Sequence, residues 1–205
     1  MTSRFIHLHL HTEFSLADST IRVPEKPDEA RPEKAKRPNL LSRAVELQLP
    51  ALAVTDRNNL FALVKFYKAA MGGGIKPICG ADLWLSNKDP ENTVSRISLL
   101  AMNGVGYRNL TELISRGFID GQRNGQVIIE REWVAEAAEG LIMLSAAKEG
   151  EIGVALISGN TEEAETLARE WMTVFPDRFY LEIQRTKRPN DEEHLHAAVA
   201  LAEKI

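Results

Sequence analysis

The chain has 205 residues, of which 44% are hydrophobic and 26% are charged, as in a soluble globular domain with a full core. Its net charge of −4 argues against a broad nucleic-acid-binding surface, because such binding depends on Lys and Arg that neutralise phosphates. Cys79 is the only cysteine, which excludes an intramolecular disulfide and favours a reducing, cytoplasmic compartment. The sequence contains no secretory signal peptide and no apolar run long enough to span a membrane, so we expect no membrane partner.

A histidine-rich segment, Phe5 to Thr12, comes first along the chain. Read as a β-strand, it alternates between an apolar face and a face that carries His7, His9 and His11. Residues two apart on a strand have Cα atoms ~7 Å apart, so the ring nitrogens can converge on one metal ion or bracket two. A half-exposed strand with outward polar residues is the alternative interpretation. The concentration of histidines just before the acid Asp18 favours a metal site.

The other His-x-His, His194-Leu195-His196, lies in a helical pattern near the C-terminus. A step of two residues on a helix points side chains to nearly opposite sides, so these imidazoles cannot share an ion. We interpret this pair as surface residues.

The stretch Thr20 to Asn39 contains four prolines among alternating acids and bases, and we expect an extended loop or insertion with little to bury. From there on, apolar periodicity predicts helices and strands in alternation. The predicted helices cover 40–47, with Asn39 as N-cap, 60–71, 107–116, 133–138, 151–157, 162–175 and 192–204. The predicted strands cover 51–55, 75–85, 97–101, 141–144 and 179–183.

This alternation predicts an α/β fold with a largely parallel sheet, either a barrel or an open doubly wound form. In both forms the functional edge is the C-terminal end of the strands, where His11, Asp56 and Asp82 fall. The chain ends just after a helix, where such a fold would run into another strand, so we expect a fragment of a longer protein.

Five segments give the sequence a family resemblance, and they span nearly the whole chain: His7 to Ser15 with Asp18, Ala51 to Leu60, Gly74 to Asp82, Leu99 to Leu110 and Phe179 to Ile183. In this order they resemble the PHP (polymerase and histidinol phosphatase) domain, in the version found at the N-terminus of bacterial DNA polymerase III alpha subunits. The resemblance implies a distorted (β/α)7 barrel over residues 1–205, incomplete at the C-terminus, with the polymerase domains outside this chain. It also implies a cluster of up to three divalent ions that active members use to hydrolyse phosphoesters.

Four residues keep a metal-ligand type when the family pattern is carried over. His9 and His11 match the opening His-x-His, Asp18 matches the acid that follows, and Asp82 stands where the family usually has a glutamate. Zn, Mn or Mg could bind these residues at low occupancy.

Two other family positions depart from the pattern. Active members have a histidine where this chain has Arg57, and another just beyond the 179–183 strand, where this chain has Gln184-Arg185-Thr186. The closing Asp-x-His motif of the family would lie past Ile205.

Arg57 weakens any metal site that contains it, because a guanidinium is permanently protonated and offers no lone pair. Two unit charges about 4 Å apart repel by about 4 kcal/mol at an effective dielectric of 20, and a divalent ion faces about twice that. We expect Arg57 to pair with Asp18 or Asp82 and to replace the lost cation.

The leading hypothesis is a domain with no catalytic residues of its own, within a DNA-directed DNA polymerase (a nucleotidyltransferase). It would support the remainder of the alpha chain, dock the proofreading exonuclease (epsilon) subunit, and meet DNA only through the full holoenzyme. The alternative is an active metal-dependent phosphoesterase or 3′–5′ exonuclease. A free-standing enzyme like histidinol phosphatase is disfavoured by the segment Asn103 to Leu110 and by the abrupt end.

Overall fold

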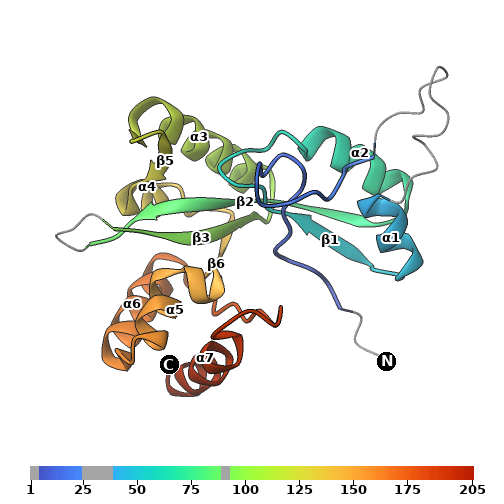
Figure 1. Cartoon of the computed structure of the whole chain (residues 1–205). Coiled ribbons are helices and arrows are strands. Elements are labelled where there is room, and N and C mark those ends of the chain that lie inside the picture. The colour runs from blue at the N-terminus through green and yellow to red at the C-terminus, as the bar shows by residue number, and fades with distance from the viewer. Residues whose placement is uncertain (1–4, 25–38, 89–92) are drawn as a thin grey trace. The chain divides into compact units, whose positions relative to one another are not determined.

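The computed structural model describes residues 5–24, 39–88 and 93–205, so most of the proline-rich stretch lies outside the described residues. The chain forms two compact units, Met1–Ala81 and Asp82–Ile205. Figure 1 shows their helices and strands in chain order.

The first unit contains α1 (Leu40–Glu46), β1 (Ala51–Val54), α2 (Leu63–Gly72) and the start of β2 (Lys76–Ser86). The two strands pair in parallel, with Ala51 opposite Lys76 and Val54 opposite Cys79. The predicted cap of α1 is confirmed, because the Asn39 side chain accepts hydrogen bonds from the backbone N–H groups of Leu41 and Ser42. Asn59 accepts a bond from the N–H of Phe61, and this turn delays α2 relative to the predicted start at residue 60.

The end of α1 is a turn in which Gln48 takes the left-handed conformation, with φ of 53°. The N–H of Gln48 donates to the carbonyl of Val45, and the N–H of Leu49 donates to that of Ala44. This is the pattern of a Schellman turn, and it brings Leu49 against the core.

The histidine-rich segment runs alongside β1. The N–H of Ala53 donates to the carbonyl of His7 at 2.9 Å, and the N–H of Thr55 donates to that of Leu10 at 2.9 Å. It forms one isolated bridge, between His7 and Leu52, instead of the predicted regular strand. The regular strand is interrupted at Leu10, because the N–H of Leu10 donates to the hydroxyl of Thr55 rather than to a backbone carbonyl.

A hydrophobic core fills the first unit between the helices and the strand pair. Its buried members are Val23, Leu41, Ala44, Leu52, Val54, Ala62, Phe66, Ala70 and Ile75. The stretch Thr20 to Asn39 was expected to have little to bury, but its residue Val23 is 2% exposed and belongs to this core. The backbone N–H of Val23 lies 3.3 Å from the Glu13 carboxylate, to which it donates.

The second unit contains the end of β2 and the remaining elements. They are β3 (Val94–Ala101), α3 (Gly104–Asp120), β4 (Gln122–Arg123), β5 (Gln126–Ile129), α4 (Arg131–Glu136), β6 (Leu141–Leu144), η2 (Ala147–Glu149), α5 (Glu151–Ile157), α6 (Thr161–Val174), β7 (Phe179–Tyr180) and α7 (Asp191–Lys204). The strands follow the order β4-β5-β2-β3-β6-β7, and α5 packs against both α6 and α7 (Figure 1).

The predicted α/β class is confirmed, but the sheet is more mixed than expected. β2 pairs with β5 and β6 with β7 in parallel, whereas β3–β6 and β4–β5 are antiparallel. The reason is the short connection between β2 and its neighbour β3, which end and begin at Ser86 and Val94. Parallel pairing requires a crossover of a dozen or more residues, and this connection has seven. Within the described residues β4 and β7 each have one strand neighbour, so the sheet is not closed there, as expected for an incomplete barrel.

The backbone at the start of α3 lies very close to the backbone of the loop before β6. A Cβ atom on Gly106 would lie 1.9 Å from the carbonyl oxygen of Gly140, and Gly140 itself has a positive φ of 71°. Asn103 caps α3 by accepting from the N–H of Gly106. Helix and loop therefore meet at a contact that leaves no room for a side chain.

The expectation that His194 and His196 both lie at the surface is wrong for His194. Its side chain is buried in the second unit and is 3% exposed, whereas His196 is exposed. The two imidazoles point to different sides of α7, as predicted, but the pair is not entirely at the surface. Among the helices of the described ranges, none has both the length and the apolarity that crossing a bilayer requires.

Candidate metal centre

His9 and His11 bring their ring nitrogens together in the first unit. The two Nε2 atoms are 3.3 Å apart and the ring centroids 5.0 Å apart, because alternate residues of an extended segment share a side. A tetrahedral ion that binds nitrogen at about 2.0–2.1 Å holds two ligand nitrogens roughly 3.3 Å apart. A hydrogen bond between the rings has the same length, so the pair can share either a proton or a metal ion.

Asp18 joins this pair from the turn that follows it. The N–H of Ser15 donates to the carbonyl of Thr12, and the N–H of Asp18 donates to that of Ser15. This turn brings the Oδ2 atom of Asp18 into contact with Nδ1 of His11. Asp18 therefore lies on the side of the His11 ring that faces away from His9.

Arg57 completes the cluster at the end of the loop after β1. Its Nη2 donates to Oδ1 of Asp18 at 2.9 Å, and the two side chains are 30% and 23% exposed. The expected ion pair of Arg57 with Asp18 is confirmed. The Nε atom of Arg57 is buried and has no hydrogen-bond partner among the described residues.

Asp56 holds the loop that carries the cluster, although it was not among the predicted ligands. It is 1% exposed and accepts hydrogen bonds from the N–H of Thr12 at 2.6 Å, the hydroxyl of Thr12 at 2.7 Å and that of Ser15 at 2.6 Å. The Ser15 hydroxyl also accepts from the N–H of Arg57. The sequence signal was the position of Asp56, an acid directly after a fully buried strand. In the structure its carboxylate ties two loops together through Thr12 and Ser15.

Asp82, the fourth predicted ligand, begins the second unit and is 2% exposed. Within that unit its carboxylate accepts from Nη1 of Arg96 at 3.1 Å and from the hydroxyl of Ser98 at 3.1 Å. Arg96 also pairs with Glu149 at 2.7 Å and stacks over the ring of Trp84. Asp82 is thus part of a buried ion-pair network.

The residues at the second departure from the family pattern bind neighbouring acids. Gln184 donates to Glu182 at 2.7 Å, and Arg185 makes two bonds to Glu192. Thr186 donates to Asp191 through its N–H and its hydroxyl. These side chains hold the loop before α7, and none of them is an imidazole or a carboxylate.

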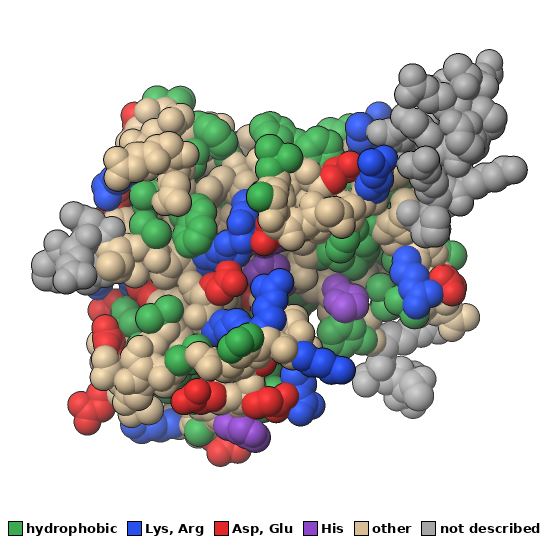
Figure 2. All heavy atoms as spheres, viewed as in Figure 1, with side chains coloured by type: hydrophobic (Ala, Val, Ile, Leu, Met, Phe, Trp, Pro, Cys, Tyr) green, Lys and Arg blue, Asp and Glu red, His purple; other side chains and the backbone are tan. Residues whose placement is uncertain are grey.

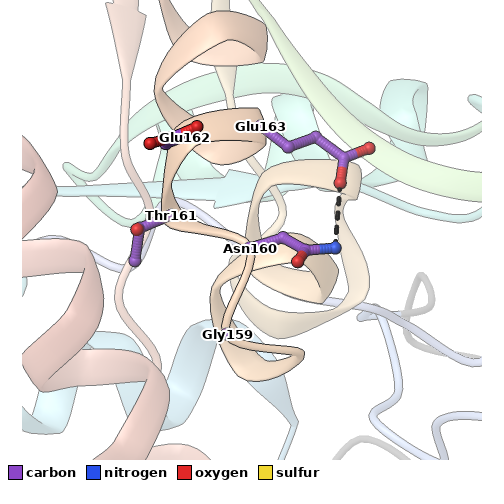
Figure 3. Close-up of a pocket in the computed structure, with 5 residues that line it drawn as sticks. All are labelled: Gly159, Asn160, Thr161, Glu162 and Glu163. Atoms are coloured by element: carbon purple, nitrogen blue, oxygen red, sulfur yellow. Dashed lines mark hydrogen bonds between the residues drawn. The ribbon is translucent and has the colours of Figure 1, made fainter.

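His7 and a hollow in the second unit contain none of the four predicted ligands. The exposed His7 packs edge-on against Phe5, with ring centroids 4.6 Å apart. A hollow in the second unit lies at the start of α6, where Asn160 donates to Glu163 (Figure 3). Its lining, residues 159–163, contains none of the predicted ligands.

Comparison with known proteins gives one family. The model described as PHP domain matches residues 7–186, which includes most of both units. DNA polymerase III subunit alpha of Pseudomonas fluorescens is 70% identical over 205 residues, and that of Escherichia coli K12 is 41% identical over 200 residues. These alignments cover 100% and 98% of this chain but 16% of each relative, so the chain spans about a sixth of their length. The chain belongs to the PHP domain family.

Proposed function

We propose that this chain is the N-terminal PHP domain of a cytoplasmic replicative DNA polymerase III alpha subunit. Its degenerate metal site would serve as a structural element of a scaffold that carries the remainder of the alpha chain and docks the proofreading exonuclease subunit. The relatives' names support the polymerase assignment. The family pattern supports the docking role, and DNA would be contacted through the full holoenzyme.

The proposed loss of metal function rests on one observation, the ion pair of Arg57 with Asp18. The guanidinium places a permanent positive charge beside the carboxylate and uses one of its oxygens. A cation bound at Asp18 would lie close to this charge, at a cost of several kcal/mol at short range. Arg57 would thus provide the charge balance that a metal ion provides in active members.

A second candidate function, metal-dependent phosphoester or 3′–5′ hydrolysis, is favoured by the 3.3 Å separation of the two Nε2 atoms. His9 and His11 would hold one ion, with zinc suited to two imidazoles. Asp18 at Nδ1 of His11 would then orient the ring, as carboxylates often do for metal-bound histidines. Such an ion would lower the pKa of a bound water.

Metal content and hydrolysis together decide between these functions. The full polymerase alpha chain is purified, its zinc and manganese are quantified by mass spectrometry, and it is incubated with a 3′-labelled oligonucleotide and manganese. We expect substoichiometric metal and no hydrolysis that depends on His9 or His11. Stoichiometric metal, with turnover that H9A and H11A abolish and the surface variant H196A retains, would overturn the scaffold assignment.

The docking role has a separate test. Hydrogen exchange is measured on the full alpha chain with and without the purified exonuclease subunit. We expect exonuclease-dependent protection within residues 5–205, and H9A should bind the subunit as tightly as wild type. Protection confined to residues beyond Ile205 would contradict the docking role.

A further inference from the structure

The loop before α7 carries a concentration of positive charge. Residues 184–190, which we call the basic loop, read Gln-Arg-Thr-Lys-Arg-Pro-Asn and contain three basic residues and no acid. Figure 1 draws the loop as the red trace that leads into α7, and Figure 2 shows Lys and Arg side chains at the surface in that region. The chain as a whole has a net charge of −4, so the basic loop differs from the average surface.

Asp191, the first residue of α7, holds the basic loop in one conformation. It is 4% exposed, and its Oδ2 atom accepts hydrogen bonds from the N–H of Thr186 at 2.7 Å, the hydroxyl of Thr186 at 2.9 Å and the N–H of Arg188 at 3.1 Å. Lys148 also binds the loop, because its Nζ atom donates to Oδ1 of Asp191 at 2.6 Å and to the carbonyl of Pro189 at 2.8 Å. A ligand that binds a loop ordered in this way avoids the entropic cost of ordering it.

Lys187 and Arg188 are the basic side chains that this loop presents to solvent. Both residues are exposed, and among the described residues neither side chain makes an ion pair or a hydrogen bond. Apart from Arg108 on α3, the other arginines of the second unit bind carboxylates or carbonyl oxygens: Arg96, Arg116, Arg123, Arg131, Arg169, Arg178 and Arg185. Two adjacent unpaired charges are therefore unusual within the described part of this unit.

The acids that follow the basic loop in the sequence are already compensated. Glu192 is bound by Arg185 through two hydrogen bonds, at 2.8 and 3.1 Å, and Asp191 is bound by Lys148. Glu193 lies with them in the first turn of α7, where a carboxylate complements the positive end of the helix dipole. The two unpaired positive charges of the loop therefore remain available to an anion.

We infer that Lys187 and Arg188 bind phosphates of the DNA backbone in the full polymerase chain. This inference rests on the proposed function. A guanidinium offers a planar fork of donors that matches phosphate oxygens, and an ammonium binds them as a point charge. Contacts of this kind position a protein on DNA without reading its sequence. One loop suffices for them, in agreement with a net charge that argues against a broad nucleic-acid-binding surface.

A phosphate backbone fits the basic loop better than an acidic protein surface does. Interfaces between proteins have an apolar centre, whereas contacts with phosphates need none. Pro189 is the only apolar residue of the loop, and the residues from Arg185 to Asn190 are all exposed. Binding to phosphates releases the counterions of DNA, so the affinity that these contacts contribute should fall as the salt concentration rises.

The salt dependence of DNA binding by the full alpha chain tests the inference. Binding of a fluorescein-labelled primer–template duplex, without nucleotides, is measured by fluorescence anisotropy at several salt concentrations. K187Q/R188Q removes both charges, and neither side chain has a partner among the described residues whose loss would affect folding. We expect the slope of log K against log salt concentration to decrease in magnitude by about 2, since each lost phosphate contact contributes roughly 0.9.

Two control variants separate a local contact from a change in net charge. K65Q/K68Q removes the same two charges from exposed positions on α2 and should keep the wild-type slope. K187R/R188K exchanges the two residues, keeps both charges and should also keep this slope. All three variants should retain the wild-type melting temperature, which thermal unfolding measures.

Three outcomes would overturn the inference alone. An unchanged slope in K187Q/R188Q would mean that the loop does not contact DNA, and an equal decrease in K65Q/K68Q would reduce the effect to net charge. Unchanged DNA binding together with weaker binding of the purified exonuclease subunit would assign the loop to an acidic surface of that protein. Failure of the wild-type chain itself to bind the duplex would instead contradict the proposed function, and the inference with it.

Discussion

At the scale of single residues, the site is a chain of polar contacts from Arg57 through Asp18 and His11 to His9. A carboxylate can only accept, so the contact of Asp18 with Nδ1 of His11 places a proton on that nitrogen when the ring is neutral. The lone pair of His11 Nε2 then faces Nε2 of His9. Nε2 of His11 is the atom that would bind a metal ion. A proton on Nε2 of His9 can take the place of that ion.

The variant R57H tests whether arginine suppresses metal binding. Removing the guanidinium eliminates a charge repulsion and offers an imidazole in its place, so we expect zinc affinity to rise by at least about tenfold. Isothermal titration calorimetry measures the change. R43H, at an exposed position on α1, is the control for an added surface histidine. An unchanged affinity in R57H would mean that Arg57 does not act on the ion.

The variant D56N tests the residue that ties the two loops together. An amide offers one acceptor oxygen where the buried carboxylate accepts three hydrogen bonds, so donors of Thr12 and Ser15 would lose their partners. We expect the free energy of unfolding to fall by about 1–3 kcal/mol, as measured by chemical denaturation. The exposed variant E112Q should change it by no more than about 0.5 kcal/mol. Equal effects of the two substitutions would show that Asp56 has no such role.

At the scale of elements, the most accurate predicted bounds came from apolar runs. The predicted strand 141–144 and helix 151–157 have the observed bounds of β6 and α5. The hairpin of β4 and β5 was missed because its strands are two and four residues long, too short for a periodic pattern. Its signal was the dipeptide Asn124-Gly125, whose positive φ angles are typical of a tight hairpin turn.

The turn that ends α1 offers a prediction at this scale. Gln48 is exposed and has a left-handed φ, which strains a residue with a Cβ atom but not glycine. The variant Q48G should therefore raise the free energy of unfolding by about 0.5–1 kcal/mol. The control E46G, inside the same helix, should lower it by about 1 kcal/mol. Thermal and chemical unfolding measure both. Destabilisation by Q48G would show that the turn gains nothing from glycine.

The site was predictable from the sequence in part. The convergence of His9 with His11 was expected, since alternation in an extended segment fixes it. Charge predicted that Arg57 pairs with Asp18 or Asp82, and the structure shows the pair with Asp18. Which ring nitrogen of His11 meets Asp18 depends on the turn at residues 12–18, where Ala17 has a positive φ, and no periodic pattern reveals such a turn. The role of Asp56 depends on tertiary hydrogen bonds for the same reason.

At the scale of the whole molecule, acid should destabilise the fold through the second unit. Burial lowers the pKa of His194 below its ordinary value of 6.5, while Glu182 opposes this shift. The unfolded chain therefore binds a proton at a higher pH than the folded chain, and stability decreases as the pH falls through 6.5. At lower pH, Asp191, whose pKa is held far below its usual value by Lys148, adds a further loss.

The melting temperature as a function of pH checks this expectation. Between about pH 7.5 and about pH 5.5 the wild type should lose stability, and H194Q should show a flatter slope because the titrating group is gone. H196Q, on the exposed side of α7, should keep the wild-type slope. A slope in H194Q equal to that of the wild type would assign the acid sensitivity to other groups.

The contact between Gly106 and Gly140 limits how this domain can vary. A methyl group at Gly106 would overlap the opposing carbonyl oxygen, so the start of α3 and the loop before β6 would have to separate. In a saturation library, codon 106 should therefore return glycine alone among functional clones, even though it carries no chemistry. Such invariance would record a steric exclusion, and an alignment by itself would misread it as the signature of an active residue.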